Sequence, residues 1–159
     1  SRRDIVSEQF GVRLPQSAEK GVDPNSTMEA RLFDDMLPFT FQIRAVVHHS
    51  LGAIRGVQVG AFAPPGGTPP ANYAGLQSLV ISAHADLKKV TPEEVNACAG
   101  KEVIFTVRDM KLPFTAEGFR QSFSLPNFYF HATTAYDILR NKGVPVGKRD
   151  FLGRMKLKS

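Results

Sequence analysis

Hydrophobic residues recur with helical spacing in three long stretches of the chain. The first runs from Met36 to Gly56, and its apolar side chains fall on two adjoining faces, which predicts a largely buried helix. The second, Ala71 to Lys89, carries one apolar stripe. The third, Thr115 to Asn141, begins at a good N-cap residue and contains Pro126, which predicts a kink. The pattern therefore predicts a bundle of helices.

Between the second and third stretches the period of the pattern changes from helical to alternating. Apolar side chains at Val103, Phe105 and Val107 alternate with their neighbours, which is typical of a β-strand. Residues 111–114 can return antiparallel beside this strand, with residues 108–110 as the turn. We expect a small β-hairpin that packs on the helices.

Prolines and glycines mark the loops. Residues 63–70, APPGGTPP, exclude the interior of a helix or strand and predict a crossover loop. Residues 21–27, GVDPNST, have the composition of a loop, and a short helical turn is expected over Met28–Leu32. Another short helical turn is predicted at Thr91–Glu94, where Thr91 resembles an N-cap. Gly143 is placed to end the last helix.

The segment GKRDFLG, residues 147–153, combines glycines with basic side chains. It follows the C-terminal end of a helix, where the dipole disfavours an anion, so we do not predict a phosphate loop. We expect Asp150 to pair with Lys148 or Arg149 and to hold the C-terminal segment against the bundle. The side chains expected to pack beneath it are Phe151 and Leu152.

The composition is that of one globular domain over residues 1–159. A chain of this length buries about two thirds of its unfolded surface, and with 42% hydrophobic residues it predicts no disorder. No apolar run approaches ~18 residues, so no membrane partner is predicted. The one cysteine, Cys98, forms no intrachain disulfide, and no secretory signal is recognisable, so we expect a cytoplasmic protein. Much of the +5 charge lies near the termini, including the basic tail 154–159, and without a nucleic-acid motif it predicts no nucleic-acid partner.

The C-terminal motif LPNFYFHATTAYDILRNKGVPVGKRDFLG, residues 125–153, closely resembles a domain-of-unknown-function family in the DinB-like superfamily. The segment ARLFDDMLPFTFQ, residues 30–42, strengthens the resemblance, which covers about residues 21–153. It implies a mainly α fold, a DinB-like four-helix bundle with a long crossover, here with a small β-hairpin before the last helix. Residues 1–20 lack the repeat of the family's first helix and form a divergent N-terminal segment.

In the wider superfamily the resemblance implies a metal site of three histidines on facing helices. Carried over, His48 takes the first position and His131 a position on the later helix, but Ala135 stands where the usual third ligand would be. His49 points about a third of a turn away from His48, and Asp137 is poorly placed relative to His131. We therefore expect no metal and no other cofactor, with a divalent metal at His48 and His131 left open.

Two histidines in an apolar pocket suit acid–base catalysis, because imidazole titrates near neutral pH and burial keeps it neutral. We expect an enzyme that acts on a small organic molecule, for example an aromatic one, by isomerisation, elimination or group transfer, with His48 and His131 as acid and base. The residues expected to contact the substrate are Phe41, Phe128, Tyr129 and Tyr136.

Other interpretations stay open. His131 can be a satisfied core histidine with His48 partly exposed, and the aromatic side chains of the last helix can simply be core. The chain would then be a non-catalytic ligand-binding module or a dimeric assembly module. A homodimer is also expected because an incomplete first helix would expose an apolar face. Whether His48 and His131 converge on an open cavity separates these interpretations.

Overall fold

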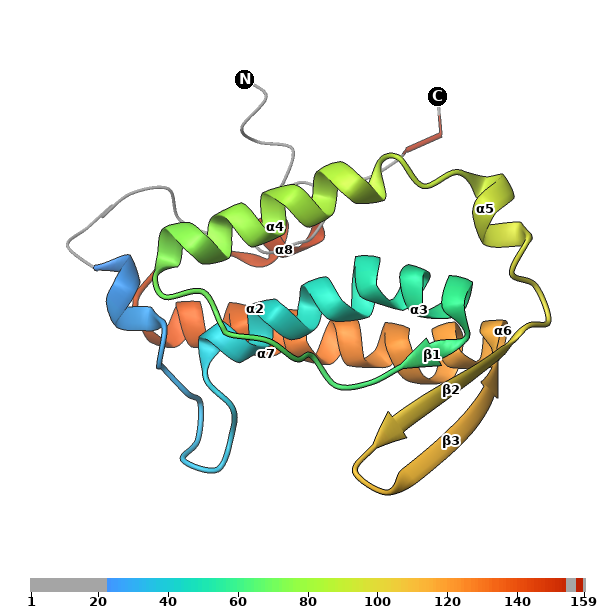
Figure 1. Ribbon diagram of the computed structural model, residues 1–159. Coiled ribbons are helices and arrows are strands. Elements are labelled where there is room, and N and C mark those ends of the chain that lie inside the picture. The colour runs from blue at the N-terminus through green and yellow to red at the C-terminus, as the bar shows by residue number, and fades with distance from the viewer. Residues whose placement is uncertain (1–22, 154–156, 159) are drawn as a thin grey trace.

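Three helical stretches form the body of the molecule in the computed structural model, which describes residues 23–153 and 157–158 (Figure 1). Each of the first and third stretches consists of consecutive segments without a break in the helical backbone. The first contains α2 (Phe39–Val47), η2 (His48–Gly52) and α3 (Ala53–Val59). The second is α4 (Tyr73–Leu87), and the third contains α6 (Ala116–Gly118), η3 (Phe119–Ser124) and α7 (Leu125–Asn141). The predicted helical fold is confirmed, whereas residues 1–20 lie outside the described part.

α2 packs along α7 and also against α4, and the apolar faces of these helices form the larger core. Phe39 stacks on Tyr73 with 6.4 Å between ring centroids. Ala135, at the position where the resemblance would place a third histidine, is fully buried. The largest fully buried apolar side chains of this core are Phe39, Ile43, Leu76, Ile138 and Leu139.

A three-stranded sheet closes one end of the helices (Figure 1). β2 (Glu102–Val107) and β3 (Met110–Thr115) form the predicted antiparallel hairpin, and Arg108 adopts a positive φ of 52° in its turn. β1 (Ala61–Phe62) pairs in parallel with β2 and was not predicted, because two residues carry no pattern. The smaller core lies under this sheet, and its buried side chains include Val57, Phe62, Val103, Phe105 and Phe119.

α3 approaches β1 closely at Gly56. A Cβ atom at this position would lie 2.8 Å from the Phe62 side chain and 3.1 Å from the carbonyl oxygen of Ala61. Glycine is therefore required for this contact, which places the chain that leaves α3 directly against its own helix.

η2 and η3 are π-helical turns inside otherwise α-helical stretches, and such turns are frequent at functional sites. Pro126 lies at the first positions of α7, directly after η3. Proline has no backbone N–H to donate. At this position the π-turn η3 already interrupts the regular α-helical hydrogen bonds, so the missing donor falls where the pattern is irregular. The first helix was predicted over Met36–Gly56. In the structure this helical stretch begins at Phe39 and, beyond η2, ends at Val59.

The short elements follow local capping. η1 (Pro24–Thr27) is a 3-10 helix capped by Asp23, so the short turn expected over Met28–Leu32 lies a few residues earlier. α5 (Pro92–Asn96) has the predicted cap, since Thr91 and Glu94 exchange two side-chain-to-backbone hydrogen bonds. Gly143 has a φ of 83° after α7, as predicted.

α8 (Lys148–Leu152) corrects the expected C-terminal ion pair. The Asp150 carboxylate accepts a hydrogen bond from the backbone N–H of Gly147 at 2.8 Å and so caps α8, rather than pairing with Lys148 or Arg149. Phe151 does pack on Tyr136, with 5.8 Å between ring centroids. Leu152 is 55% exposed, so its predicted burial is wrong.

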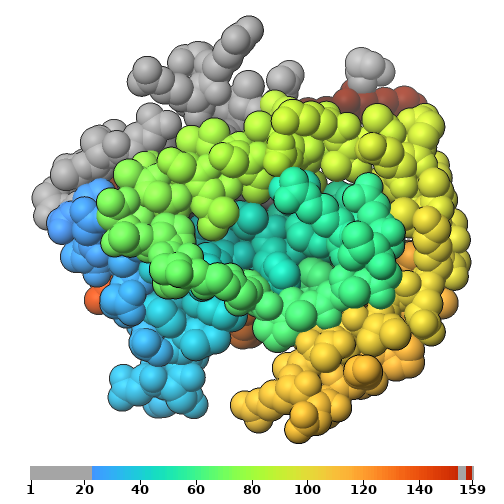
Figure 2. Space-filling model, in the orientation of Figure 1, coloured from blue at the N-terminus to red at the C-terminus, as the bar shows by residue number. Residues whose placement is uncertain are grey.

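Two parts of the chain project on the same side of the molecule, the loop of residues 31–38 and the β2–β3 hairpin (Figure 2). Large apolar side chains are exposed in both, and also on α7. They are Leu32, Phe33, Leu37, Met110, Leu112, Leu125, Tyr129 and Phe130. In the described part of the chain, no helix has both the length and the apolar character needed to cross a bilayer.

Candidate functional site

Three histidine rings lie in a row where η2 meets α7. His48 and His49 open η2, and His131 belongs to α7. The ring centroids of His48 and His49 are 5.7 Å apart, and those of His49 and His131 are 6.0 Å apart with nearly parallel planes. Among the described residues, the imidazole that stacks on His131 is therefore His49, and His48 in turn contacts His49 edge to face.

Gln42 determines which nitrogen of His131 carries the hydrogen. Its side-chain Nε2 donates to the carbonyl oxygen of Leu37 at 2.8 Å, which fixes the orientation of the amide. The amide oxygen, Oε1, lies 2.7 Å from His131 Nδ1 and can only accept. Nδ1 must donate, and in the neutral ring Nε2 keeps a free lone pair. Gln42 is only 2% exposed, so its side of this hydrogen bond lies inside the protein.

His48 is held by the segment that follows β1. Its Nε2 lies 2.6 Å from the carbonyl oxygen of Ala63, so Nε2 is the protonated nitrogen of the neutral ring. The ring also stacks on Phe62 with 4.3 Å between centroids. A Cβ atom at Gly52 would come within 3.1 Å of His48 Nδ1, which shows how closely the ring lies against its own helix.

His49 is enclosed by aromatic rings and by the end of η3. Its ring centroid lies 5.4 Å from that of Phe62 and 5.7 Å from that of Phe123. The hydroxyl of Ser124 donates to the His49 carbonyl oxygen at 2.9 Å. The same Oγ lies 3.4 Å from His49 Nδ1, a long contact in which the hydroxyl oxygen can act as acceptor.

Burial lowers the pKa of all three histidines. Burial, together with the smaller effects of positive charge on His48 and on His131, lowers the pKa of His49 to about 4. The pKa of His131 is lowered by burial. The pKa of His48 is also lowered by burial, and its hydrogen bond to Ala63 opposes this effect. All three rings are therefore predominantly neutral at pH 7.

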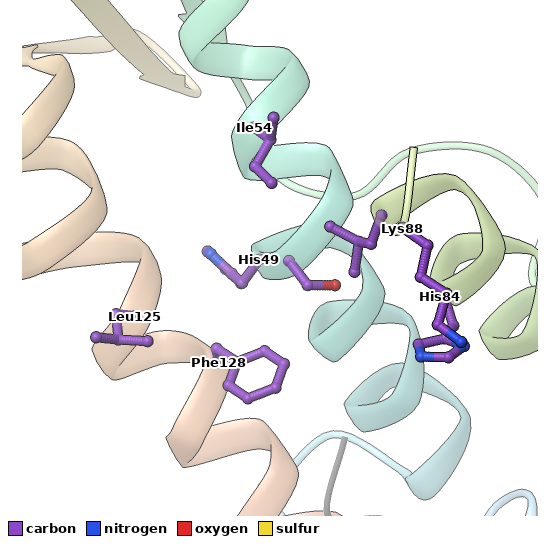
Figure 3. A pocket seen from close by; sticks show the side chains of 8 residues that line it. His49, Ile54, His84, Lys88, Leu125 and Phe128 are labelled. Atoms are coloured by element: carbon purple, nitrogen blue, oxygen red, sulfur yellow. The ribbon is translucent and has the colours of Figure 1, made fainter. Parts of the chain in front are cut away.

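An open pocket of about 490 Å³ adjoins the row at His49. It lies between η2 and α3 on one side, α4 on another and α7 on the third (Figure 3). Leu125 and Phe128 contribute from α7, and His84 and Lys88 from α4. Its volume falls in the range of small-molecule sites. Within the described part of the chain, the other lining residues are His49, Ser50, Ile54 and Leu87.

The structure brings together some of the residues expected at the site and separates others. Phe41 meets the His131 ring edge-on at 5.8 Å between centroids. Phe128 lines the pocket, whereas Tyr129 is 54% exposed and Tyr136 packs on Phe151. His48 and His131 are both half-buried and do not line the pocket, whereas His49 does.

His49 was not among the site residues expected from the sequence. Its spacing from Gln42 carries a signal, because residues seven apart lie on nearly the same face of a helix. Gln42 contacts His131 on that face, and His49 does so about two turns later. An amide and an imidazole on one apolar helix face thus indicate the side that meets a polar partner.

The three-histidine metal site implied by the resemblance does not fit the residues present. Within residues 23–153 and 157–158, no three His, Cys, Asp or Glu side chains are arranged to hold a metal ion. His48 Nε2 and His131 Nδ1 are already directed at oxygen acceptors.

Comparisons with known proteins agree with this fold. A family model described as "Domain of unknown function (DUF1993)" matches residues 15–152. Among solved structures, a DinB family member protein from Shewanella denitrificans is similar, with a TM-score of 0.73 and 26% sequence identity over 89% of this chain and 80% of that chain. The search of curated proteins found no significant match.

Proposed function

Since the chain belongs to the DUF1993 family and has a DinB-like fold, we propose that it is an enzyme that transfers protons on a small organic substrate. Isomerisation, elimination and group transfer are the reaction types that such chemistry serves. The observation that supports the proposal is the hydrogen bond of His131 to the buried Gln42. It holds the ring in one tautomer, as a general base requires.

His131 is the proposed proton acceptor. Its Nδ1 hydrogen is committed to Gln42, so the lone pair on Nε2 is the group that takes a proton. Burial lowers the pKa of the ring, which keeps it in the basic form at neutral pH. Phe41 packs against the same ring in an edge-to-face arrangement.

His49 and His48 are the proposed partners in proton exchange. A positive charge on His131 or His48 lowers the pKa of His49, so protonation of one ring disfavours protonation of the next. The row therefore takes up one proton more readily than two. His48 and His131 thus stay part of the proposal, and His49, which contacts both rings, is the one that lines the pocket. Phe128 would contact the substrate in the pocket, and the Tyr129 and Tyr136 hydroxyls would do so only outside it.

The test uses 5-nitrobenzisoxazole, a neutral aromatic reporter. A base removes the C3 proton, the N–O bond breaks and the ring opens to a coloured cyanophenolate. We expect ring opening faster than with an equal concentration of free imidazole, and a rate that rises with pH around a pKa below 6.5. His131→Gln should lower the rate at least tenfold, and Gln58→Ala, at an exposed position on α3, should not.

A rate no higher than that of free imidazole, or an equal rate in His131→Gln, would overturn the proposal. The second candidate is a non-catalytic ligand-binding module. The pocket favours it, because His49 lines the pocket whereas His48 and His131 do not. Ligand binding without ring opening of the reporter would select that candidate.

A further inference from the structure

We infer that the pocket between η2–α3, α4 and α7 binds an organic carboxylate with a compact apolar body, whose anionic group lies at Lys88. The inference deepens the proposed function by naming a ligand class for the same site. Only the conversion of this ligand to a product rests on the proposed function. Binding itself depends on the pocket alone. Three observations carry it: the apolar walls, the balance of charge at the rim and the orientation that the rim imposes.

The walls are apolar and come from three different helical stretches. Ile54 comes from α3, Leu87 from α4, and Leu125 and Phe128 from α7. Figure 3 shows Phe128 and Leu125 directed from α7 into the space that faces the other two helices. Walls of this kind bind the apolar body of a ligand, and a few polar groups then set its orientation.

In the described part of the chain, the rim carries positive charge without a compensating carboxylate. Among the described residues that line the pocket there is no Asp or Glu. The nearest acidic residue along α4, Asp86, already pairs with Arg55 at 3.1 Å and with Lys89 at 2.8 Å. Lys88 is exposed, and its charge reaches the site, because together with burial it lowers the pKa of His84. A ligand anion would therefore find an ammonium group at the rim.

Lys88 also determines which way the ligand points. It is the C-cap residue of α4, and the carbonyl groups at this end of the helix repel an anion. A carboxylate must therefore lie out at the ammonium group, with the apolar body directed inward to Phe128 and His49. Ser50 reinforces this orientation, since its hydroxyl donates to the Val47 carbonyl at 3.0 Å and offers a ligand only an acceptor.

The experiment compares 2-naphthoate with 2-naphthamide by isothermal titration calorimetry. The two molecules have the same shape and differ in charge. We expect naphthoate to bind more tightly, and Lys88→Gln to weaken naphthoate binding about fivefold, the effect of one partly exposed ion pair, with naphthamide unchanged. Lys101→Gln is the matched control, because it removes an equal charge from an exposed lysine that does not line the pocket.

A second pair of variants tests the location. Leu125→Trp should abolish binding of both ligands by filling the pocket, and the side chain is exposed enough for the protein to tolerate the change. Ile81→Trp, at a 54% exposed position of α4 outside the lining, should leave both affinities unchanged. Equal effects of Lys88→Gln and Lys101→Gln, or undiminished binding in Leu125→Trp, would overturn the inference, as would absence of naphthoate binding at millimolar concentration.

The two proposals can fail separately. Calorimetry registers naphthoate binding whether or not any proton moves. The ring-opening assay uses a neutral reporter that needs no anion site. If naphthoate binds but His131→Gln opens the reporter ring as fast as the unchanged protein, the pocket assignment stands and the enzyme proposal fails. If the reporter is turned over but naphthoate does not bind, the enzyme proposal stands and the pocket assignment fails.

Discussion

The hydroxyl of Ser124 donates a 2.9 Å hydrogen bond to the backbone carbonyl of His49. Each residue belongs to one of the two π-helical turns, so this bond joins η3 directly to η2. A π-turn leaves carbonyl groups without their regular α-helical partner, and a side-chain donor from a neighbouring helix can satisfy one of them. The irregular turns thus stabilise each other across the helix interface.

Ser124→Ala should lower the free energy of unfolding by about 1–2 kcal/mol, because the His49 carbonyl loses its donor inside the protein. Urea denaturation measures this loss. Ser78→Ala is the control: that side chain is exposed on α4 and donates to the Ala74 carbonyl of its own helix, so its effect should stay within about 0.5 kcal/mol. Equal effects of the two changes would contradict the proposed importance of the η2–η3 bond.

Gln42→Glu should raise the pKa of His131, because a carboxylate would replace the amide oxygen that faces Nδ1. The measurement is a pH titration of the histidine ring nitrogens by nuclear magnetic resonance. Gln58→Glu introduces the same group at an exposed position of α3 and should leave the His131 titration nearly unchanged. A His131 pKa that does not move in Gln42→Glu would mean that the two side chains are not bonded in solution.

Acid should destabilise the protein through His49. Its pKa is about 4 in the folded chain and 6.5 ordinarily, so between these values the unfolded state binds more protons than the folded state. Stability is therefore intact above about pH 6.5 and falls as the pH decreases toward 4. His49→Gln should reduce the difference between urea midpoints at pH 7 and pH 5. A difference as large as in the unchanged protein would exclude His49 as its source and direct attention to His48, His84 and His131, whose pKa values are lowered as well.

Gly56→Ala should destabilise the contact between α3 and β1 by about 1–3 kcal/mol, the usual cost of overpacking. The added methyl group would meet Phe62 at 2.8 Å and the Ala61 carbonyl oxygen at 3.1 Å. Thermal unfolding measures the effect. Gly66→Ala is the control, since a Cβ there meets no atom within 4 Å. An unchanged melting temperature in Gly56→Ala would show that α3 and β1 are farther apart in solution.

The homodimer remains a prediction. The described residues expose Phe33, Tyr129 and Phe130 by more than half of their surface, and exposed apolar side chains favour association. Sedimentation equilibrium at micromolar concentration should yield about twice the chain mass of 17.5 kDa. A single species at the chain mass would reject the homodimer. The variant Phe130→Ser tests whether α7 takes part, since its effect on folding should be small at an exposed position.

Much of the fold could be predicted because its signals are local. The alternation of Val103, Phe105 and Val107 and the Thr91–Glu94 cap depend on residues only a few positions apart, and both features are observed. The pairing of β1 with β2 was missed because it joins residues about forty positions apart through a strand of two. Asp150 was misjudged because a backbone amide competes with lysine and arginine for the carboxylate, and the sequence shows only the side chains.

The candidate site was harder to predict for a related reason. A uniform α-helical repeat was assumed through His48–Gly52, where the chain forms a π-turn. His48 stands at the position where the family resemblance places the first histidine. The stacking of His49 on His131 instead depends on how η2 and α7 lie relative to each other. Contacts between distant helices leave no periodic signal in one chain. The lowered pKa values were anticipated in direction, because apolar surroundings alone predict them.

A π-turn holds one residue more than the α-helical turn that it replaces, so η2 accommodates one residue that a regular helix of the same rotation would not contain. Deleting one residue between His48 and Gly52 would leave a regular α-helical turn, and the segments before and after it would keep their orientation about the helix axis. Gln42 and Gly56 would therefore still face His131 and Phe62, respectively. The same deletion within α2 or α3 would rotate the two flanking segments by about 100° relative to each other, so the chain should tolerate the loss of a position in η2 better than a loss on either side of it.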